Sequence, residues 1–294
     1  MSYDLYFMPR AGSIDPERFA AYFAGRPNFK VSLPQAWYQN DETGVYFVFQ
    51  VKQETAASDE GDEEEPNHPV SLNINYFRPS YFILEAEPEI TAFVRAFDLL
   101  VSDPQINGMG EGEYDRERLI SGWTHGNEFG YSAILRAPGN GSDIVSLPTA
   151  ALMDTWRWNL NRKTLQQELG ESRFVPLVRV ILRSGLPCTA AVWPDGIPIA
   201  TPRVDYFFVG RRELAPRRFF RRVQDQTLLA WDNALPIIDK YRSPQFTDFY
   251  LLDYDQPPAE VRKFIESLPS DASEIKGVAA DQVLNRELVE KHRG

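Results

Sequence analysis

The sequence predicts an α+β protein in which antiparallel sheets are flanked by helices, arranged as two lobes of related size. The chain has 294 residues, about two average domains. Segments with strand and helix character group by type and do not alternate as βαβ units, which favours α+β over a doubly wound fold. Residues 137–142 have the Pro-Gly-Asn composition of a linker. We therefore expect an N-terminal domain at 1–137 and a C-terminal domain at 146–294.

The N-terminal domain is expected to open with a strand over residues 3–7 and a helix that starts within residues 13–16. Two strands, 36–39 and 45–51, then form a hairpin around a short loop that ends in glycine. The second of these strands is apolar at nearly every position of its first half, so we expect it to be covered on both faces.

A run of acidic side chains interrupts this domain at residues 53–69. The acidic residues that we single out there are Asp59, Glu60, Asp62, Glu63, Glu64 and Glu65. Like charges at this density repel one another, and the segment has nothing apolar to bury. We expect a disordered acidic surface loop.

The remaining part of the N-terminal domain is expected to hold strands at 70–77, 81–84 and 131–135, and a short helix at 116–122. Pro88 is expected to begin another helix, because apolar residues recur after it at helical spacing. These apolar residues are Ile90, Phe93, Val94, Phe97 and Leu100.

The C-terminal domain is expected to begin with a long helix at 148–169. Three strand-like segments follow with short connections, which predicts an antiparallel meander of residues 174–182, 189–193 and 204–209. The other predicted elements are a helix at 225–235, a strand at 249–254, and helices at 258–268 and 281–291.

Charge is distributed unevenly between the two halves. Residues 1–150 hold ten Lys and Arg against 23 Asp and Glu, a balance of −13, and residues 151–294 have a balance of +2. An acidic field repels nucleic acid and anionic lipid and attracts basic partners. The sequence therefore predicts no nucleic-acid and no membrane partner.

The compartment is predicted from cysteine usage and from the N-terminus. Cys188 is the only cysteine, so no internal disulfide can form. The first ten residues lack the basic and apolar regions of a secretory signal, and no run of 18 apolar residues occurs. These features predict a cytoplasmic location.

No catalytic motif is recognisable. A Gly-x-Ser-x-Gly elbow is absent, and Cys188 falls in a predicted strand, where buried cysteines are usually inert. Among the histidines His68, His125 and His292, only His125 has neighbours that could orient an imidazole, and a surface role is the more common one. We predict no catalytic residues.

Metal and phosphate sites are not predicted either. Oxygen-bearing residues surround a glycine-rich turn, but their spacing is not that of an EF-hand. They are Asp103, Asn107, Glu111, Glu113 and Asp115. The glycines at 108–112 follow no strand directly, and their acidic neighbours would repel phosphate. The sequence therefore predicts neither a cofactor nor a bound metal.

The most unusual basic feature is a cluster of six arginines within twelve positions. The cluster comprises Arg211, Arg212, Arg217, Arg218, Arg221 and Arg222. Guanidinium groups bind carboxylate and phosphate through paired hydrogen bonds. The cluster could pair with the acidic half of the chain, bind an anionic ligand or serve as a docking patch.

Three segments resemble a family of uncharacterised bacterial proteins. They are Tyr3-Asp4-Leu5-Tyr6-Phe7, Asn40-Asp41-Glu42-Thr43-Gly44-Val45-Tyr46-Phe47 and Trp156-Arg157-Trp158-Asn159. In type, an acidic chain without catalytic motifs is similar to immunity proteins that neutralise secreted antibacterial toxins. The resemblance implies a binding role and transfers no site residues.

Two functions remain as hypotheses. The first is a non-enzymatic cytoplasmic binding protein, of the immunity type, whose acidic half meets a basic protein such as a toxin. The second is an enzyme or sensor for a small anionic ligand held near residues 211–222, which requires a pocket with convergent polar groups.

Overall fold

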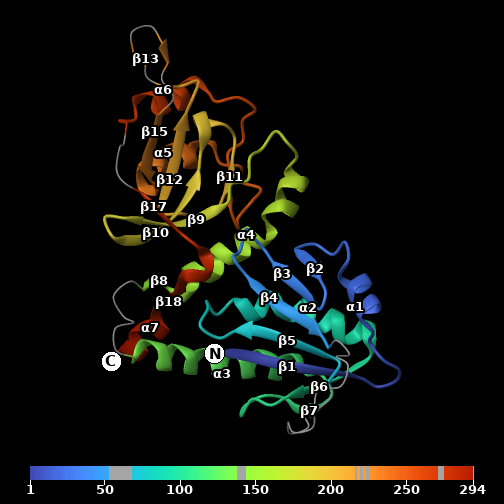
Figure 1. Cartoon of the computed structure of the whole chain (residues 1–294). Coiled ribbons are helices and arrows are strands. Elements are labelled where there is room, and N and C mark those ends of the chain that lie inside the picture. The colour runs from blue at the N-terminus through green and yellow to red at the C-terminus, as the bar shows by residue number, and fades with distance from the viewer. Residues whose placement is uncertain are drawn as a thin grey trace. The chain divides into compact units, whose positions relative to one another are not determined.

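The computed structural model describes residues 1–52, 68–137, 144–215, 225–270 and 275–293, and the backbone alone at 217–218 and 221–222. It confirms the α+β class, with helices and mainly antiparallel sheets (Figure 1). The contacts within the chain divide it into two compact units. Unit 1 is Met1–Thr149 together with Asp281–Gly294, and unit 2 is Ala150–Ala280.

Unit 1 is built on a seven-stranded sheet in which all neighbours run antiparallel, in the order β2-β3-β4-β5-β1-β6-β7. The strands are β1 Ser2–Pro9, β2 Phe29–Ser32, β3 Gln35–Gln39, β4 Tyr46–Val51, β5 Val70–Asn75, β6 Leu99–Asp103 and β7 Gly110–Gly112. The expected strands at 3–7, 36–39, 45–51 and 70–77 are confirmed, whereas β2, β6 and β7 were not predicted.

One face of this sheet carries the aromatic core. Phe7 of β1 and Phe49 of β4 meet Phe93 with ring centroids 5.4 and 4.9 Å apart, and Phe23 stacks on Phe93 at 5.5 Å. Phe23 belongs to α1 (Pro16–Phe23), whose first turn is capped by the Asp15 carboxylate at 2.7 Å from the Arg18 amide. Phe93 belongs to α2 (Phe82–Phe97). Burial of these rings fixes which face of every strand points inward.

The prediction that the strand at 45–51 is covered on both faces is wrong. In β4, Phe47, Phe49 and Val51 are buried, but Tyr46 and Val48 on the opposite face are only partly buried. Strand β4 is covered on one face only, because it belongs to an antiparallel sheet. Such sheets are stable with a single layer packed on one face.

Two boundaries of α2 differ from the prediction. Residues 81–84 were expected to be a strand, but Tyr81 is the N-cap residue, the helix begins at Phe82, and Pro88 lies inside it. Burial of Phe82 and Ile83 against the core outweighs the missing proline hydrogen bond. The helix ends at Phe97 because Asp98 adopts a left-handed conformation with φ of 51°, and Leu100 therefore belongs to β6.

Helix α3 is a single helix, Arg116–Leu135, where a short helix at 116–122 and a strand at 131–135 were predicted. Glycines at 122, 126 and 130 break the apolar pattern, but they recur every four residues and so lie on one side of the helix. A Cβ atom at Gly126 would lie 2.1 Å from the Tyr76 ring. The glycines therefore allow close packing, and do not end the helix.

The C-terminal segment returns to unit 1, although the predicted second domain extended to residue 294. It forms η2 (Ala280–Gln282), β18 (Val283–Asn285) and α7 (Arg286–Arg293), and β18 pairs in parallel with β8 (Val145–Leu147). Asn285, which is 1% exposed, binds the Ser80 amide at 2.9 Å, the Ser80 hydroxyl at 2.8 Å and the Thr149 hydroxyl at 3.0 Å. Its backbone amide also donates to the Tyr131 hydroxyl at 3.1 Å.

We expect Asn285→Ala to lower the free energy of unfolding by about 2 kcal/mol, because it leaves buried groups on Ser80 and Thr149 without a partner. Urea denaturation measures this loss. Asn161→Ala is the matched control, because the Asn161 amide makes a single bond to the Arg157 carbonyl on an exposed helix surface. Equal effects of the two substitutions would contradict the role assigned to Asn285.

Unit 2 contains a five-stranded sheet in the order β15-β12-β10-β9-β17. Its strands are β9 Val178–Arg183, β10 Leu186–Val192, β12 Tyr206–Arg211, β15 Asp225–Ala230 and β17 Lys276–Val278. Shorter pairs are β11 Ala200–Thr201 with β16 Tyr250–Leu251, and β13 Arg217–Arg218 with β14 Arg221–Arg222. The helices are α4 Thr149–Leu169, α5 Trp231–Tyr241 and α6 Ala259–Ser267, with the short turn η1 at Pro194–Gly196.

The predicted helices at 148–169 and 258–268 are confirmed, but the meander is only partly so. β9 and β10 are antiparallel neighbours, whereas β10 and β12 run parallel. The connection between them contains η1 and β11, which gives it the length that a parallel crossover needs. Residues 225–230 were expected to be helical and form β15 instead, because pairing with β12 buries Thr227 and Leu229 on alternate positions.

Candidate functional site

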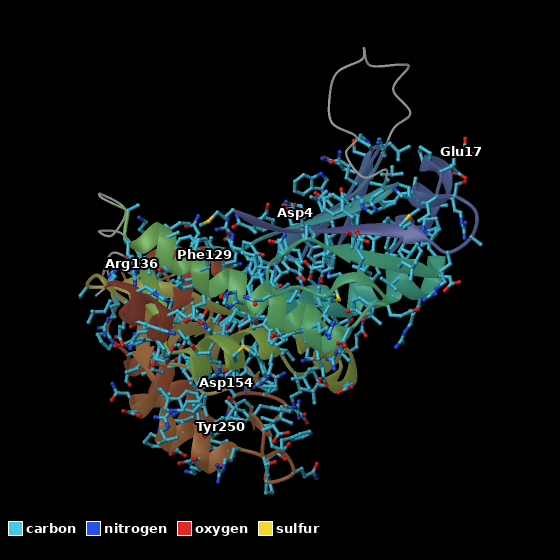
Figure 2. All side chains as sticks on the ribbon, turned by 90° about the horizontal axis from the view of Figure 1, so that it is seen from below. Asp4, Glu17, Phe129, Arg136, Asp154 and Tyr250 are labelled. Carbon is cyan, nitrogen blue, oxygen red and sulfur yellow. The ribbon has the colours of Figure 1, made fainter. Side chains whose placement is uncertain are left out.

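The face of the unit 1 sheet opposite the aromatic core is a candidate binding surface. We call it the open face. It carries Asp4 and Tyr6 from β1, Trp37 from β3, Tyr46 and Val48 from β4, and Asn73 from β5. These side chains are exposed or only partly buried, and Trp37 is 43% exposed. In Figure 2 the Asp4 label and helix α3 lie on opposite sides of β1.

Hydrogen bonds between side chains hold the open face in a defined arrangement. The Asn73 amide donates to Asp4 at 2.6 Å, and the Gln35 amide donates to Gln50 at 3.1 Å. The Trp37 indole N–H donates to the Gln35 Oε1 at 2.9 Å. Side chains that are already ordered lose less conformational entropy when a partner binds.

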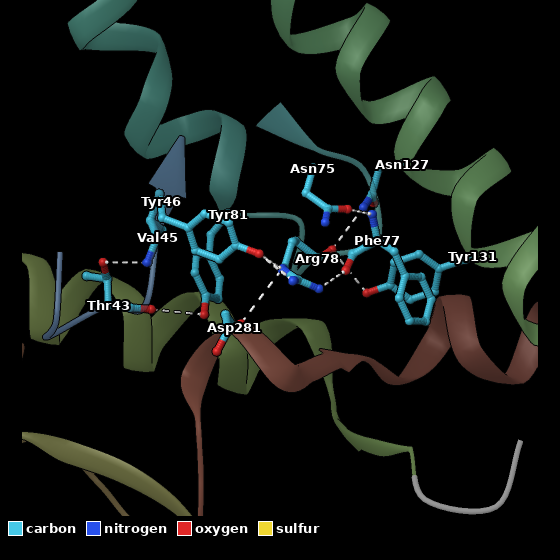
Figure 3. Close-up of polar contacts among 10 residues, drawn as sticks. All are labelled: Thr43, Val45, Tyr46, Asn75, Phe77, Arg78, Tyr81, Asn127, Tyr131 and Asp281. Carbon is cyan, nitrogen blue, oxygen red and sulfur yellow. Dashed lines mark hydrogen bonds and ion pairs between the residues drawn. The ribbon is translucent and has the colours of Figure 1, made fainter. Parts of the chain in front are cut away.

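Arg78 supports one end of the open face (Figure 3). Its Nε and Nη2 both donate to the Tyr46 hydroxyl, the first at 2.8 Å, and its Nη1 donates to the Phe77 carbonyl at 2.8 Å. Asp281 lies 3.8 Å from the Arg78 Nε. The Arg78 carbonyl accepts from Asn127 at 2.9 Å. Arg78 therefore fixes the position of Tyr46 at the end of β4 and is not a free ligand-binding group.

Buried carboxylates of unit 1, which the sequence did not single out, also have structural partners. Glu85 accepts from the hydroxyls of Tyr38 and Thr43, both at 2.9 Å, and from the Asn40 amide at 2.8 Å. All three donors lie in or next to the hairpin loop between β3 and β4. A carboxylate with this many donors stabilises a loop and has no need of a metal ion.

The glycine-rich loop after β6 is ordered by its acidic residues. Asp103 is 2% exposed and accepts from the Tyr3 hydroxyl at 2.5 Å and the Met109 amide at 2.9 Å. Burial, together with the Asp103 carboxylate, raises the pKa of Tyr3, so the hydroxyl remains a donor. Asp115 caps α3. Within the described ranges, no group of three or more His, Cys, Asp or Glu side chains is placed to hold a metal ion.

The acidic residues predicted to bind a partner, Asp59, Glu60, Asp62, Glu63, Glu64 and Glu65, lie outside the described residues. So does most of the predicted acidic loop. The described part of unit 1 adds exposed or partly buried carboxylates at the rim of the sheet: Asp41 and Glu42 after β3, and Glu111 in β7.

The arginine cluster does not act as one group. Arg211 has no exposed surface, and its guanidinium donates to both oxygens of Asp225 at 2.8 and 2.7 Å. The same group also donates to the carbonyls of Ile265 and Leu268 at 3.0 and 2.6 Å. Arg211 thus joins β12, β15 and α6, and it is not available to a ligand.

The other arginines of the cluster lie on or beside a small hairpin. Arg212 is exposed, and Arg217 and Arg218 pair through their backbones with Arg222 and Arg221. Contacts between their side chains and a ligand therefore remain a prediction.

The structure places the possible nucleophile and two of the possible bases in different environments. Cys188 is buried in β10, where desolvation, with a contribution from Asp205, raises the pKa of its thiol. His125 is exposed on α3, and His292 is buried in α7 with its Nε2 at 3.7 Å from Glu128.

Comparison with known proteins gives no relative: no protein-family model, no curated protein and no solved structure matches this chain. Among the described residues, no helix has the length and apolar character needed to cross a membrane.

Proposed function

We propose that this protein is a non-enzymatic cytoplasmic binding protein that engages a basic protein through the open face of unit 1. The observation that carries the proposal is an antiparallel sheet face that no helix of the described part of unit 1 covers. It is rich in aromatic and amide side chains, and the unit has a strong excess of acidic residues.

The chemistry of the open face suits protein recognition. Tyr and Trp give large contact areas at low entropic cost, while Asn and Ser adapt their hydrogen bonds to a partner. Trp37 and Tyr6 would be the main anchors, because a few aromatic residues dominate the energy of most interfaces. Seven strands at a spacing of about 4.8 Å extend over about 29 Å, which is wide enough for an interface of standard size.

The charge of unit 1 selects the class of partner. Residues 1–150 have a balance of −13, whereas the open face itself carries few charges. The open face is thus a weakly charged surface within an acidic unit. In many protein–protein interfaces a polar rim speeds association, and aromatic residues at the centre stabilise the complex. A toxin with a basic active-site cleft would meet these requirements, which agrees with the immunity-type role implied by the sequence resemblance.

We expect Trp37→Ser to weaken capture of the partner by about 30-fold, which corresponds to the loss of about 2 kcal/mol from a central aromatic contact. The experiment immobilises the whole chain, identifies the retained protein and measures its affinity with the purified partner. Phe129→Ser is the matched control, because Phe129 is a 62% exposed aromatic residue on α3, outside the open face.

Salt provides a second measurement on the same complex. Raising the ionic strength from about 0.05 to 0.5 M should slow association and leave dissociation almost unchanged. Reversing Asp59, Glu60 and Glu63 to lysine should likewise slow association more than it speeds dissociation. A complex that tolerates Trp37→Ser, or that forms equally fast at both ionic strengths, would rule out this mode of binding, as would the absence of any partner.

A further inference from the structure

A pocket of about 520 Å³ lies at one end of the unit 2 sheet. Three chain segments meet there: the hairpin between β9 and β10, the start of β12, and the junction of β15 with α5. The strand directions explain this meeting, since β10 and β12 are parallel and both begin at this end, while their antiparallel neighbours β9 and β15 finish there. The pocket is therefore a consequence of the sheet topology, and all its lining residues belong to unit 2.

Two arginines, Arg183 and Arg203, line the pocket. The Arg183 Nη1 donates to the Tyr206 hydroxyl at 2.7 Å, and its guanidinium carbon lies 4.7 Å from the centre of the Tyr206 ring. These contacts fix the guanidinium plane, and among the described residues it has no hydrogen-bond partner other than the Tyr206 hydroxyl. Within the described residues, no carboxylate lies within ion-pair distance of either arginine.

Two carboxylates, Asp205 and Asp232, line the same pocket. Asp205 is held by Thr189, whose amide and hydroxyl both donate to its Oδ2, at 2.7 and 2.9 Å, so its other oxygen is available. Asp232 is exposed in the first turn of α5, and in the described part of the chain no basic group forms an ion pair with it. Leu186, Val204 and Trp231 complete the pocket with apolar surface.

We propose that this pocket binds a small zwitterion, with its carboxylate or phosphate on Arg183 and Arg203 and its ammonium group on Asp205 and Asp232. These arginines and aspartates line one cavity but form no ion pairs with one another. Such groups are complementary to a ligand that carries both charges. A guanidinium held by Tyr206 is suited to paired hydrogen bonds with an anionic group. The apolar wall would contact the carbon skeleton of the ligand.

Calorimetry with three probes tests the charge pattern. Phosphoethanolamine carries both charges, inorganic phosphate only the negative one, and ethanolamine only the positive one. The whole chain should bind phosphoethanolamine at least about tenfold more tightly than it binds inorganic phosphate or ethanolamine, since each charge-assisted contact contributes a factor of this order. A panel of L-amino acids then distinguishes a carboxylate from a phosphate as the anionic group.

Single substitutions assign each end of the ligand. Arg183→Gln and Arg203→Gln should each weaken phosphoethanolamine about tenfold, and Asp232→Asn should weaken it similarly without weakening phosphate. Arg179→Gln is the matched control, because Arg179 is an exposed arginine of the same strand β9 outside the pocket. Circular dichroism confirms folding of each variant, and Arg203 and Asp232 are exposed, so their replacement should not disturb the core.

Cys188 supplies an independent measurement, because the only cysteine of the chain lines the pocket. A bound zwitterion should slow its alkylation by iodoacetamide, measured in mildly alkaline buffer since the thiol pKa is raised. The proposal is overturned if neither phosphoethanolamine nor any amino acid binds saturably at about 10 mM. Binding that is unchanged in Arg183→Gln, Arg203→Gln and Asp232→Asn would overturn it equally.

Discussion

Asp225→Asn is expected to lower the free energy of unfolding of unit 2 by about 3–5 kcal/mol, measured by urea denaturation, because it removes the charge that balances a fully buried guanidinium. The Arg211 side chain has no exposed surface, and Asp225 is its only carboxylate partner among the described residues. The carbonyls of Ile265 and Leu268 accept from Nη1, and the Ser270 hydroxyl lies 3.5 Å from Nη2, but none of these groups carries a full charge. An uncompensated charge in this position is among the most destabilising defects that a single substitution can cause.

An exposed ion pair provides the control for this result. Asp154→Asn removes the partner of Arg157 on α4, where the two side chains are 74% and 61% exposed. Water screens such pairs, so we expect a change within about 0.5 kcal/mol. If the two substitutions had similar effects, the ion pair between Arg211 and Asp225 would not stabilise unit 2 as described. The hypothesis that Arg211 binds an anionic ligand would then be favoured.

The sequence predicted those elements whose local pattern agrees with their environment. The long helix at 148–169 is one example, since its stop at Gly170 coincides with a left-handed glycine, φ 72°. The strands at 3–7 and 70–77 are others, because their apolar residues alternate and one face is buried. In these segments the local signals and the tertiary contacts favour the same structure.

Errors arose where tertiary contacts override local signals. Pro88 is a typical first residue of a helix, yet burial of Phe82 and Ile83 extends α2 in front of it. Residues 225–230 were predicted to belong to the helix that follows them, but they pair with β12 and form a strand. Neither effect can be read from a window of the chain, because the partner lies elsewhere in the sequence.

The candidate sites show the same division. The acidic half and the arginine cluster are visible as composition, but composition cannot show that Arg211 is buried and bound to Asp225. The zwitterion pocket was missed because Arg183, Arg203 and Asp232 are far apart in the chain. Only the parallel pairing of β10 with β12 brings these residues to one end of the sheet, and that pairing was predicted to be antiparallel.

Gly126→Ala is expected to lower the free energy of unfolding of unit 1 by about 3 kcal/mol, although alanine is the better helix former. A Cβ atom at this position would lie 2.1 and 2.2 Å from two carbons of the Tyr76 ring, far inside van der Waals contact. Tyr76 is 7% exposed, and its hydroxyl is held by Gln105 at 3.1 Å, so the ring cannot turn aside freely. Thermal and urea denaturation of the variant measure the loss.

A double-mutant cycle with Tyr76→Ala identifies the cause of this loss. If the clash with the ring is responsible, adding Gly126→Ala to the Tyr76→Ala background should cost nothing, or should stabilise α3 by up to about 1 kcal/mol through the higher helix propensity of alanine. If the cost of Gly126→Ala is the same in both backgrounds, the ring is not the obstacle. Close packing of α3 on Tyr76 would then not explain the glycine at position 126.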